Sequence, residues 1–280
     1  MTRPGSPWRR IWRRSGGRAG AAVLLGLLLA AVAVPPFLQD PRAQPDVVGG
    51  ALARPSAAHW LGTDHLSRDV LARVVYGARV SLAIATGAVV LSMTLGLLVG
   101  LVAGYTGGWL DAALMRLVDG ALAVPRLFLL LLMVASLERI PLPALVAVIG
   151  VTGWFGTSRL VRAEVLRLRT LDFVGAARAL GAGPGWIIFR HLLPNVAPPL
   201  TVATTLAVGD VILLEAGLSF LGLGVQPPTP TWGGMIYDAK PYLVAAPWMS
   251  LAPGLAIVLT VLAVQLVGEA LQEDSDSGPA

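Results

Sequence analysis

Residues Leu171–Pro194 read LDFVGAARALGAGPGWIIFRHLLP, a polar, arginine-bearing stretch between two long apolar segments. Thr170, immediately before it, can cap a first helix, and Gly181 stands where a helix normally ends in a left-handed residue. Pro184 suits the first turn of a second helix, which Pro194 would close. The stretch therefore predicts a hairpin of two short helices, with small residues on one arm and bulky apolar residues on the other.

Two interpretations of this hairpin follow from its residues alone. It could insert into a groove of another protein, because a flat arm beside a bulky apolar arm forms a compact protrusion. It could equally pack only against its own membrane domain at the interface. The shape by itself does not decide between docking and packing.

The composition indicates the class of protein. Of the 280 residues, 55% are hydrophobic and 13% are charged, whereas soluble domains carry about 25% charged residues. The apolar residues form blocks long enough to cross the hydrocarbon core, which requires about 20 residues of helix. We therefore expect an integral membrane protein with an all-α fold. The chain has no cysteine, which excludes a disulfide framework, a thiol nucleophile and a cysteine-based metal site.

Six apolar segments predict six transmembrane helices. The second to fifth are rich in Gly, Ala, Ser and Thr, which lets helix backbones approach closely in lipid. The predicted spans are Ala19–Leu38, Val80–Gly104, Ala112–Leu137, Leu142–Thr157, Val196–Leu218 and Trp248–Gly268.

The arginines predict the orientation of the spans. One group lies in residues 1–18, before the first span, and another lies in residues 159–190, between the fourth and fifth spans. An even number of spans places both groups on one side, and the positive-inside rule makes that side cytoplasmic. Both termini are therefore expected in the cytoplasm. The first span, with AVA at residues 31–33, also resembles a cleavable secretory signal, an alternative that leaves the remaining topology unchanged.

The segments outside the spans divide the chain further. In the Pro-, Ala- and Asp-rich loop after the first span, Ser67 is expected to cap a short interfacial helix. A Gly- and Pro-rich loop before the last span is too broken to predict a regular helix. The expected divisions are a basic cytoplasmic tail 1–18, a first helix 19–38, an extracytoplasmic loop 39–78, a five-helix core 79–268 that includes the cytoplasmic loop 158–195 and the extracytoplasmic loop 219–247, and an acidic, mobile tail 269–280.

The hairpin resembles the cytoplasmic coupling loop of binding-protein-dependent ABC importer permeases. That loop has the pattern Glu-Ala-Ala, three residues, Gly, nine residues, an aliphatic residue, one further residue and Leu-Pro. Gly175 stands in place of the glutamate, which removes a charged contact, and His191 occupies the aliphatic position. The resemblance implies that both of these residues and the matching ones couple the chain to ATPase subunits. The matching residues are Ala176, Ala177, Gly181, Leu193 and Pro194.

Three further blocks are similar to the dipeptide, oligopeptide and nickel subfamily of these permeases. They are HWLGTDHLSRDVLARVVYGARVSL at His59–Leu82, MRLVD at Met115–Asp119 and LEAGLSFLGLGVQPPTPTWGGMI at Leu214–Ile236. In the first block Ser67 replaces a usual glycine and Ala72 a usual serine. The resemblance covers the chain from about residue 59 to residue 271.

This resemblance implies a type I ABC importer permease fold in a bacterial inner membrane. It also implies a homologous second permease subunit, two ATPase subunits and an extracytoplasmic substrate-binding protein as partners. The chain would form half of the translocation path for di- or oligopeptides or a similar small solute. Lipid is expected around the spans, and nucleic acid is not an expected partner.

No ATP site is expected in this chain. A Walker A loop needs a lysine followed by Ser or Thr to hold the phosphates, and the only lysine, Lys240, is followed by Pro241. ATP and Mg would be bound by the partner ATPase subunits, and this chain would hold no cofactor and no catalytic residue. The three histidines, His59, His65 and His191, are scattered, so a metal site is not expected, and His191 is interpreted as a hydrogen-bonding residue at a helix end.

Charged residues at membrane depth are costly and usually functional. Asp210, Glu215 and Arg126 are candidates for the wall of the translocation path, although packing against a partner charge is equally compatible with their positions. Arg116 and Asp119 lie three residues apart on one helix face and predict a local ion pair.

Two other classes of function are weighed against an ABC permease. A secondary transporter driven by an ion gradient would be expected to show inverted repeats; none is evident, and the hairpin would have no task. A membrane-embedded enzyme would need convergent nucleophile, base or metal ligands, and none are assembled in this sequence.

Overall fold

The computed structural model describes residues 11–46, 49–136 and 140–276, with side chains up to Gln272. The long regular elements of these residues are helices, which confirms the expected all-α class. The helices are α2 (Ser15–Ala33), α3 (Val70–Thr106), α4 (Gly108–Ala123), α5 (Arg126–Ala135), α6 (Leu142–Val151), α7 (Trp154–Leu168), α8 (Asp172–Ala179), α9 (Pro184–Ile187), α10 (Leu193–Phe220), α11 (Trp232–Ala239) and α12 (Trp248–Asp276).

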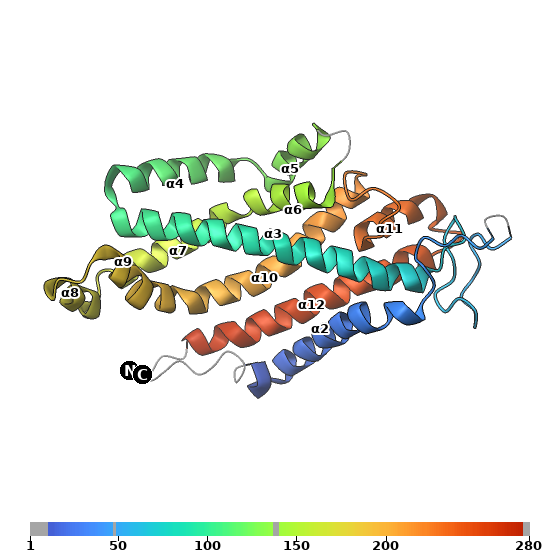
Figure 1. The fold of residues 1–280 in the computed structure, drawn as a ribbon, viewed down its shortest axis with the longest axis horizontal. Helices are drawn as coiled ribbons and strands as arrows, with labels where there is room; N and C mark the ends of the chain where they lie inside the picture. Colours follow the sequence, from blue (N-terminus) through green and yellow to red (C-terminus); the bar gives the residue numbers. More distant parts are fainter. Residues whose placement is uncertain (1–10, 47–48, 137–139, 277–280) are drawn as a thin grey trace.

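The long helices run roughly side by side along the longest axis of the molecule (Figure 1). α8 and α9 lie at one end, which we call the hairpin end. α11 and the segment between α2 and α3 lie at the other, which we call the opposite end. The start of α2 and the end of α12 both point toward the hairpin end, so the first and last helices cross the bundle in opposite directions.

Several helices are long and apolar enough to cross a membrane. In the part of the chain that the structure describes there are five such stretches, and a sixth when α4 and α5 are counted as one span bent by 83°. The expected number of spans is therefore matched only with this bent pair. The five stretches are Ser15–Ala33, Val70–Thr106, Leu142–Leu168, Pro184–Phe220 and Trp248–Gln272.

The third predicted span, Ala112–Leu137, is not one straight helix. α4 ends at Ala123, Val124 is extended with a ψ of 127°, and α5 begins after Pro125. A proline disfavours helical backbone at the residue before it and cannot donate a hydrogen bond to the preceding turn. The chain therefore changes direction at this proline. Leu137, the predicted end of the span, lies outside the described residues.

The fourth and sixth spans have different ends from those predicted. The fourth is interrupted at Thr152–Gly153 and then continues as α7 to Leu168, beyond the predicted end at Thr157. α12 continues to Asp276, so residues 269–276 are helical rather than a mobile tail. Both helices therefore extend further toward the hairpin end than hydropathy alone predicts.

The loop before the last span contains a helix that the Gly- and Pro-rich sequence did not predict. α11 begins after Thr231, whose hydroxyl accepts a hydrogen bond of 3.0 Å from the Gly234 N–H. A threonine in this position satisfies one of the free N–H groups of the first turn. The first turn of α11 is thus capped locally.

α3 is one continuous helix of 37 residues rather than an interfacial helix followed by a span. Asp69 caps it, because its carboxylate accepts a hydrogen bond of 2.8 Å from the Ala72 N–H. Ser67, the expected cap, lies before the helix with a φ of 59°. Val70, on the expected apolar face, is buried against Met235 of α11 and its neighbours. The apolar face thus packs within the protein instead of lying on the membrane surface.

The helices α3 and α7 pack closely along their length. Three glycines four residues apart on α3 face three α7 residues, and an added Cβ at each glycine would lie 2.5, 2.6 or 2.8 Å from its α7 neighbour. Only glycine permits backbones to approach this closely in a membrane bundle. The facing pairs are Gly96 with Thr157, Gly100 with Val161 and Gly104 with Val165.

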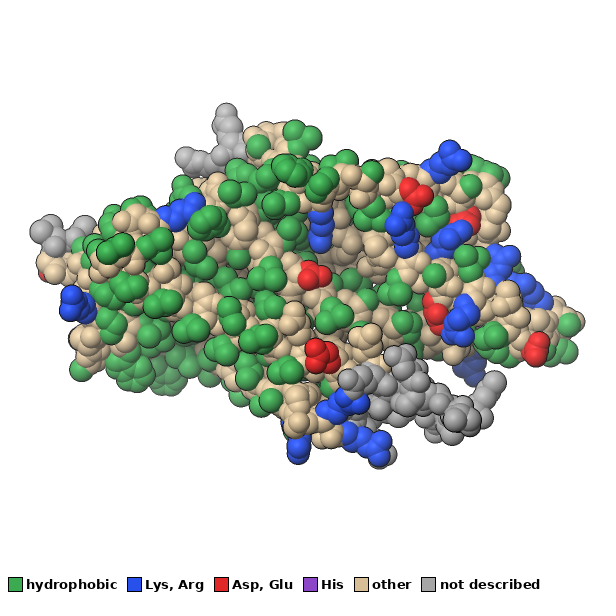
Figure 2. All heavy atoms as spheres, turned by 180° about the vertical axis from the view of Figure 1, so that it is seen from behind, with side chains coloured by type: hydrophobic (Ala, Val, Ile, Leu, Met, Phe, Trp, Pro, Cys, Tyr) green, Lys and Arg blue, Asp and Glu red, His purple; other side chains and the backbone are tan. Residues whose placement is uncertain are grey.

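The distribution of surface side chains separates the middle of the molecule from its ends. On the face in Figure 2, hydrophobic side chains cover most of the middle, and lysine and arginine side chains gather toward the hairpin end. Many of the exposed large hydrophobic residues lie on the spans, among them Leu25, Leu132 and Leu255. This pattern is typical of a protein whose middle is surrounded by lipid.

Candidate functional site: a protruding hairpin joined to a charged cavity

The glycine turn of the hairpin has the expected geometry. α8 ends at Ala179 and is followed by Leu180, and Gly181 then has a φ of 81°, in the left-handed region that favours glycine. The Gly181 N–H donates to the Arg178 carbonyl at 2.9 Å, and the Ala182 N–H donates to the Ala177 carbonyl at 3.0 Å. These bonds satisfy carbonyls at the end of α8 and close the turn. The prediction for Gly181 is confirmed.

The start and the end of the hairpin differ from the prediction. Leu171, not Thr170, occupies the cap position of α8, and the Thr170 hydroxyl donates to the Arg167 carbonyl at 2.8 Å. Pro194 does not close the second helix. α9 passes through a π-helical turn at Ile188–Leu192 directly into α10, and Pro194 lies in the first turn of α10. The wider π turn joins α9 to α10 just before Pro194, which has no N–H to donate.

One face of the hairpin is packed against the membrane helices. Val174 of α8 and Ile187 of α9 are buried with Val161 of α7 in one apolar cluster. Arg169, which lies just before α8, donates a hydrogen bond of 2.9 Å to the carbonyl of Gly104 in α3. The hairpin is therefore firmly seated on α3, α7 and α10 rather than suspended from them.

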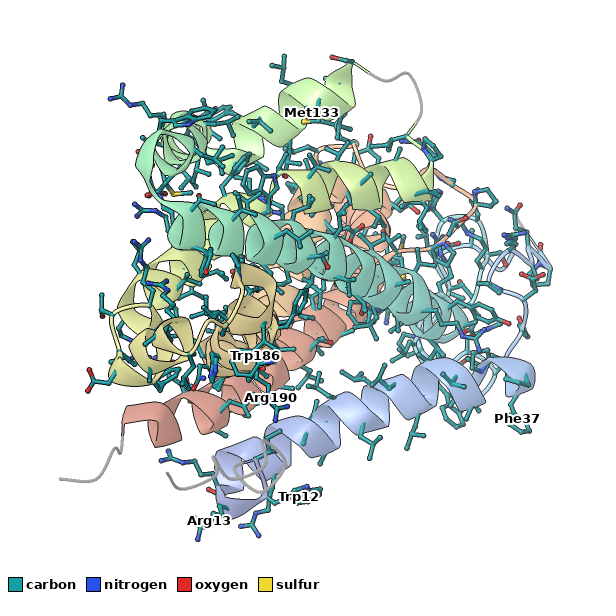
Figure 3. The ribbon with its side chains drawn as sticks, turned by 60° about the vertical axis from the view of Figure 1, so that its left-hand side comes forward. Trp12, Arg13, Phe37, Met133, Trp186 and Arg190 are labelled. Atoms are coloured by element: carbon teal, nitrogen blue, oxygen red, sulfur yellow. The ribbon has the colours of Figure 1, made fainter. Side chains whose placement is uncertain are left out.

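The other face of the hairpin is apolar and uncovered in the described chain. Leu180 is 89% exposed, Phe189 72% and Trp186 53%. Figure 3 shows Trp186 and Arg190 on the hairpin, on the same side of the molecule as Trp12 and Arg13 before α2. Gly175 is exposed, and an added Cβ there would meet no atom within 4 Å. An exposed apolar surface of this kind at the end of the bundle indicates an interaction site.

The seven residues predicted to couple to ATPase subunits fall into two groups. Gly175, Ala176, Gly181 and Pro194 are exposed, whereas Ala177 is buried and Leu193 and His191 are partly buried. The His191 ring lies 4.8 Å from the Trp186 ring and 5.6 Å from the Phe173 ring, and its Nε2 atom has no hydrogen-bond partner. The described residues thus offer that nitrogen no partner for the hydrogen-bonding role expected of His191. His191 packs the two arms of the hairpin together.

A cavity of about 270 Å³ lies between α3, α5, α7 and α10. Arg126 and Asp210, two of the three residues predicted for the path, both line it. The hydroxyl-bearing residues Ser92 and Thr157 also line it, and most of the other lining residues are aliphatic or glycine. Asp210 lies about 25 Å from the start of α10 and about 15 Å from its end, at about 1.5 Å per helical residue. The cavity is therefore at membrane depth.

Arg126 is held where two helix breaks meet. Its Nη2 donates a hydrogen bond of 2.7 Å to the Ile149 carbonyl in the last turn of α6. An added Cβ on Gly153 would lie 2.8 Å from Arg126 Nη2 and 2.7 Å from Ser92 Oγ. The break between α6 and α7 thus leaves space for the guanidinium. A second cavity of about 280 Å³, at the break between α4 and α5, is also lined by Arg126.

Glu215, the third residue predicted for the path, does not line this cavity. Its side chain lies in the bundle with 1% exposure and accepts a hydrogen bond of 2.8 Å from the Ser219 hydroxyl one turn later. The prediction that Glu215 faces the path is corrected by this burial. The residue packs where α10 approaches α11.

The predicted ion pair between Arg116 and Asp119 is also corrected. Asp119 pairs with Arg159 of α7 instead. Arg162 lies one turn further along α7, toward the hairpin end, and binds both carboxylate oxygens of Asp111 on α4. Its Nη2 donates one of these hydrogen bonds at 2.6 Å. These two pairs connect α4 to α7. Helical spacing could not reveal them, because each partner comes from another helix.

The opposite end contains a buried cluster of four charges that the sequence analysis did not assemble. Asp64 accepts hydrogen bonds from Arg68 Nε at 2.6 Å and from Arg73 Nη1. Arg73 also donates to Asp238 of α11 at 3.1 Å. Asp64, Arg68 and Arg73 are 3%, 4% and 4% exposed. Two carboxylates thus balance two guanidinium groups in a largely buried site, with Asp238 partly exposed at its edge.

The environment of Asp64 favours its ionised form. Burial raises the pKa of the carboxyl, but the Arg68 N–H bond and the charges of Arg73 and Arg68 outweigh burial and hold that pKa below its usual value. Burial and the neighbouring charge of Arg73 lower the pKa of Arg68. Asp64 and Arg68 belong to the stretch GTDHLSRD in the loop 39–78, where sequence spacing alone does not indicate a partner in α11.

Two tryptophans connect this cluster to the rest of the bundle. Trp232 donates through Nε1 to the Val74 carbonyl at 3.0 Å, and Trp248 donates through Nε1 to the Thr63 carbonyl at 3.1 Å. A hollow of about 150 Å³, lined in part by Arg73 and Asp238, opens beside the cluster. The last of the three sequence blocks thus folds onto the first.

Comparison with known proteins places these features in a family. The family model described as "Binding-protein-dependent transport system inner membrane component" matches residues 96–276. The chain is 39% identical to the dipeptide transport system permease protein of Alkalihalophilus pseudofirmus, over 97% of this chain and 90% of that protein. It is 38% identical to the glutathione transport system permease protein of Pectobacterium atrosepticum, over 97% and 91%.

Two further similarities extend the comparison. The chain is 42% identical to the nickel transport system permease protein of Escherichia coli, over 80% of this chain and 81% of that protein. Its fold is similar to a chain of the inward-facing MetNI methionine ABC transporter, with a TM-score of 0.54 and 22% identity, covering 70% of this chain and 93% of that one. At this identity the structural similarity concerns the fold alone.

Proposed function

The chain belongs to the family of binding-protein-dependent transport system inner membrane components, and we propose that it forms half of an ATP-driven path for small peptides. Membership makes it a membrane permease subunit of an ABC importer. The peptide substrate, the partner subunits and the orientation in the membrane are the parts that we add. Two of these relatives are named for the transport of dipeptides and glutathione, and one is named for nickel. We therefore favour a peptide substrate over nickel.

The observation that carries the proposal is the uncovered apolar face of the hairpin. Leu180, Trp186 and Phe189 are exposed at the hairpin end, as are the small residues Gly175 and Ala176 of α8. Such a protrusion fits a groove on an ATPase subunit, because its burial there removes apolar area from water. The same hairpin is packed onto helices α3, α7 and α10, so a displacement of its tip is passed to them.

Energy for transport comes from the partner subunits in this proposal. The only lysine of the chain precedes a proline, so a Walker A loop is missing from its sequence. ATP and Mg are held by two ATPase subunits, whose closure pushes the hairpin. α7 and α10 both leave the hairpin and both line the cavity with Arg126 and Asp210. A rigid movement of the hairpin therefore changes the shape of that cavity.

The remaining partners follow from the two ends of the bundle. The arginine-rich hairpin end faces the cytoplasm of a bacterial cell, with both termini on that side, under the positive-inside rule. An extracytoplasmic binding protein delivers the substrate to the opposite end. A homologous second permease subunit supplies the other half of the path, against the exposed apolar flanks of the spans.

A secondary transporter that acts alone is the competing function, and it leaves the apolar face of the hairpin without a task. The test is to tag the chain, purify it from native membranes and identify the proteins that accompany it. We expect ATPase subunits, and uptake in proteoliposomes that requires ATP and the binding protein. Uptake by the isolated chain under an ion gradient would overturn the proposal.

A pair of matched variants locates the ATPase contact. Phe189→Asp puts a charge on the exposed hairpin face and is expected to release the ATPase subunits during purification. Trp60→Asp changes a residue of similar exposure, 73% against 72%, at the opposite end, and is expected to retain them. Retention of ATPase subunits by Phe189→Asp would place their contact elsewhere.

A further inference from the structure

The cavity between α3, α5, α7 and α10 holds two opposite charges that do not meet. Arg126 and Asp210 both line it. In the described part of the chain, however, the two side chains form no ion pair within 4 Å. The guanidinium and the carboxylate therefore stand apart across a space of about 270 Å³.

Neither charge has its hydrogen-bonding capacity filled by the protein. Arg126 uses Nη2 to bind the Ile149 carbonyl, but its buried Nε has no partner. Asp210 is exposed in the cavity region and accepts no hydrogen bond from the residues described. Charged groups at membrane depth are costly unless they pair or serve a transported species. An unpaired guanidinium and an unpaired carboxylate in one cavity indicate a ligand that carries both complementary charges.

We propose, on the basis of the proposed function, that this cavity selects zwitterionic substrates, with Arg126 receiving a free carboxylate and Asp210 a free ammonium group. The Ile149 carbonyl holds the guanidinium at the wall of the cavity and uses only one of its nitrogens. Ser92 and Thr157 on the cavity wall offer hydroxyl groups to the amide between the two charged ends. The chain thus contributes to selectivity after the binding protein has released its load.

The arrangement also rejects singly charged solutes. A cation without a carboxylate meets Arg126 with no compensating contact, and an anion without an ammonium group meets Asp210 in the same way. Like-charge contacts of this kind reduce the affinity for wrong ligands as effectively as attractive contacts raise it for correct ones. Free amino acids and short peptides are both zwitterions. Measuring the uptake of each shows which of these two classes of substrate the cavity accepts.

The first test pairs variants of the protein with modified peptides in proteoliposomes that contain the complete transporter and its binding protein. Arg126→Gln is expected to lower the uptake of a dipeptide with two free ends about tenfold, the effect of one charge-assisted hydrogen bond. For the same dipeptide with an amidated carboxyl terminus, the variant and the wild type are expected to show equal uptake. Asp210→Asn is expected to show the same pattern with the N-acetyl peptide. Equal losses for free and capped peptides would assign both residues to structure or gating and overturn the proposal.

The second test remains decisive if the binding protein refuses capped peptides. Because this chain has no cysteine, Asp210→Cys can be modified selectively within it, with the reagent-treated wild-type complex as control. A negatively charged methanethiosulfonate is expected to restore uptake of the free dipeptide, and a positively charged one is not. Equal uptake after either reagent would overturn the proposal.

Two controls separate this proposal from the function on which it depends. Asp119→Asn neutralises a carboxylate of an exposed ion pair outside the cavity and is expected to leave the preference for free-ended peptides unchanged. Absence of ATP-dependent uptake by the wild-type complex would contradict the proposed function itself. ATP-dependent uptake that ignores both peptide termini would contradict only the role of Arg126 and Asp210.

Discussion

The two ends of this molecule handle polar and apolar groups in opposite ways. At the opposite end, Asp64, Arg68 and Arg73 are nearly buried, and their charges are balanced within the chain. At the hairpin end, Leu180 and Phe189 expose large apolar side chains that the described chain leaves uncovered. The charges of the opposite end are therefore balanced within the chain, whereas the apolar face of the hairpin is left uncovered.

This difference indicates how one chain can serve as a rigid platform and as a docking element. Residues at the opposite end tie α11 and α12 to the start of α3 through long-range hydrogen bonds, among them those of Trp232 and Trp248. The hairpin depends on local turn geometry and keeps its outer surface free. Variants at the opposite end should therefore reduce stability first, and variants at the hairpin end should reduce coupling first.

The largest effect is expected from Asp64→Asn. The substitution removes the negative charge that balances Arg68 and Arg73 and leaves two guanidinium groups buried with one carboxylate. Breaking a buried pair in this way costs about 3–5 kcal/mol. Thermal unfolding of the purified complex should show a marked loss of stability. Asp40→Asn, at an exposed carboxylate that accepts only a local N–H bond, should change stability by less than about 0.5 kcal/mol.

Equal unfolding temperatures for the two variants would show that the four-charge cluster adds nothing to the rigidity of the opposite end. The greater rigidity expected of the opposite end would then rest on the tryptophan hydrogen bonds alone.

Gly181→Val is expected to have the next largest effect, on coupling rather than on folding. The φ of 81° at Gly181 is strained for a β-branched residue, at a cost of about 1–3 kcal/mol confined to the hairpin turn. We expect normal membrane insertion, continued ATP hydrolysis and uptake reduced about tenfold or more. Uptake and ATPase activity measured together in proteoliposomes check this separation.

Gly183→Val is the matched control for this variant. Gly183 has a φ of −69° and a ψ of 160°, which a β-branched residue adopts readily, and its Cβ would also enter open space. A loss of uptake as large as that of Gly181→Val would mean that added bulk, not turn geometry, disturbs the ATPase contact.

Local features of the sequence predicted the structure better than distant contacts did. The glycine turn at Gly181 and the helix start at Pro184 depend on the φ preferences of single residues, so they could be predicted from the sequence. The break at Pro125 carried the same kind of signal, but a continuous apolar run concealed it. The continuation of α9 into α10 was missed because a π turn passes the proline at position 194.

The charged sites could be predicted only in part. Arg126 and Asp210 were identified as costly charges at membrane depth, and the structure brings them to one cavity. Glu215 carried the same signal but is buried beside Ser219, and spacing cannot distinguish these outcomes. Pairings such as Arg73 with Asp238, 165 residues apart, require the tertiary arrangement of the helices.

Acid is expected to weaken the opposite end by a smaller amount than Asp64→Asn does. Because the folded-state pKa of Asp64 lies below its usual value, its ionised form stabilises the protein above the unfolded-state pKa of about 3.9. That contribution is lost as the pH falls from there through the lower folded-state pKa. The difference in unfolding temperature between wild type and Asp64→Asn should be constant near neutral pH and shrink below about pH 4. A difference that widens on acidification would contradict this sign.

The smallest effect is expected from Gly175→Glu, which restores the charge that the coupling-loop pattern has and this hairpin lacks. Gly175 lies inside α8, where a glycine costs about 0.5–1 kcal/mol relative to a better helix former. An added Cβ at this position meets no atom within 4 Å, so the substitution should stabilise the hairpin slightly without disturbing its packing. Gly175→Ala recovers the same helix propensity without the charge. If the ATPase groove carries a complementary positive charge, the glutamate variant will retain ATPase subunits at higher salt than the alanine variant does. Identical retention of ATPase subunits by both variants would mean that the outer face of this hairpin docks through its apolar surface alone.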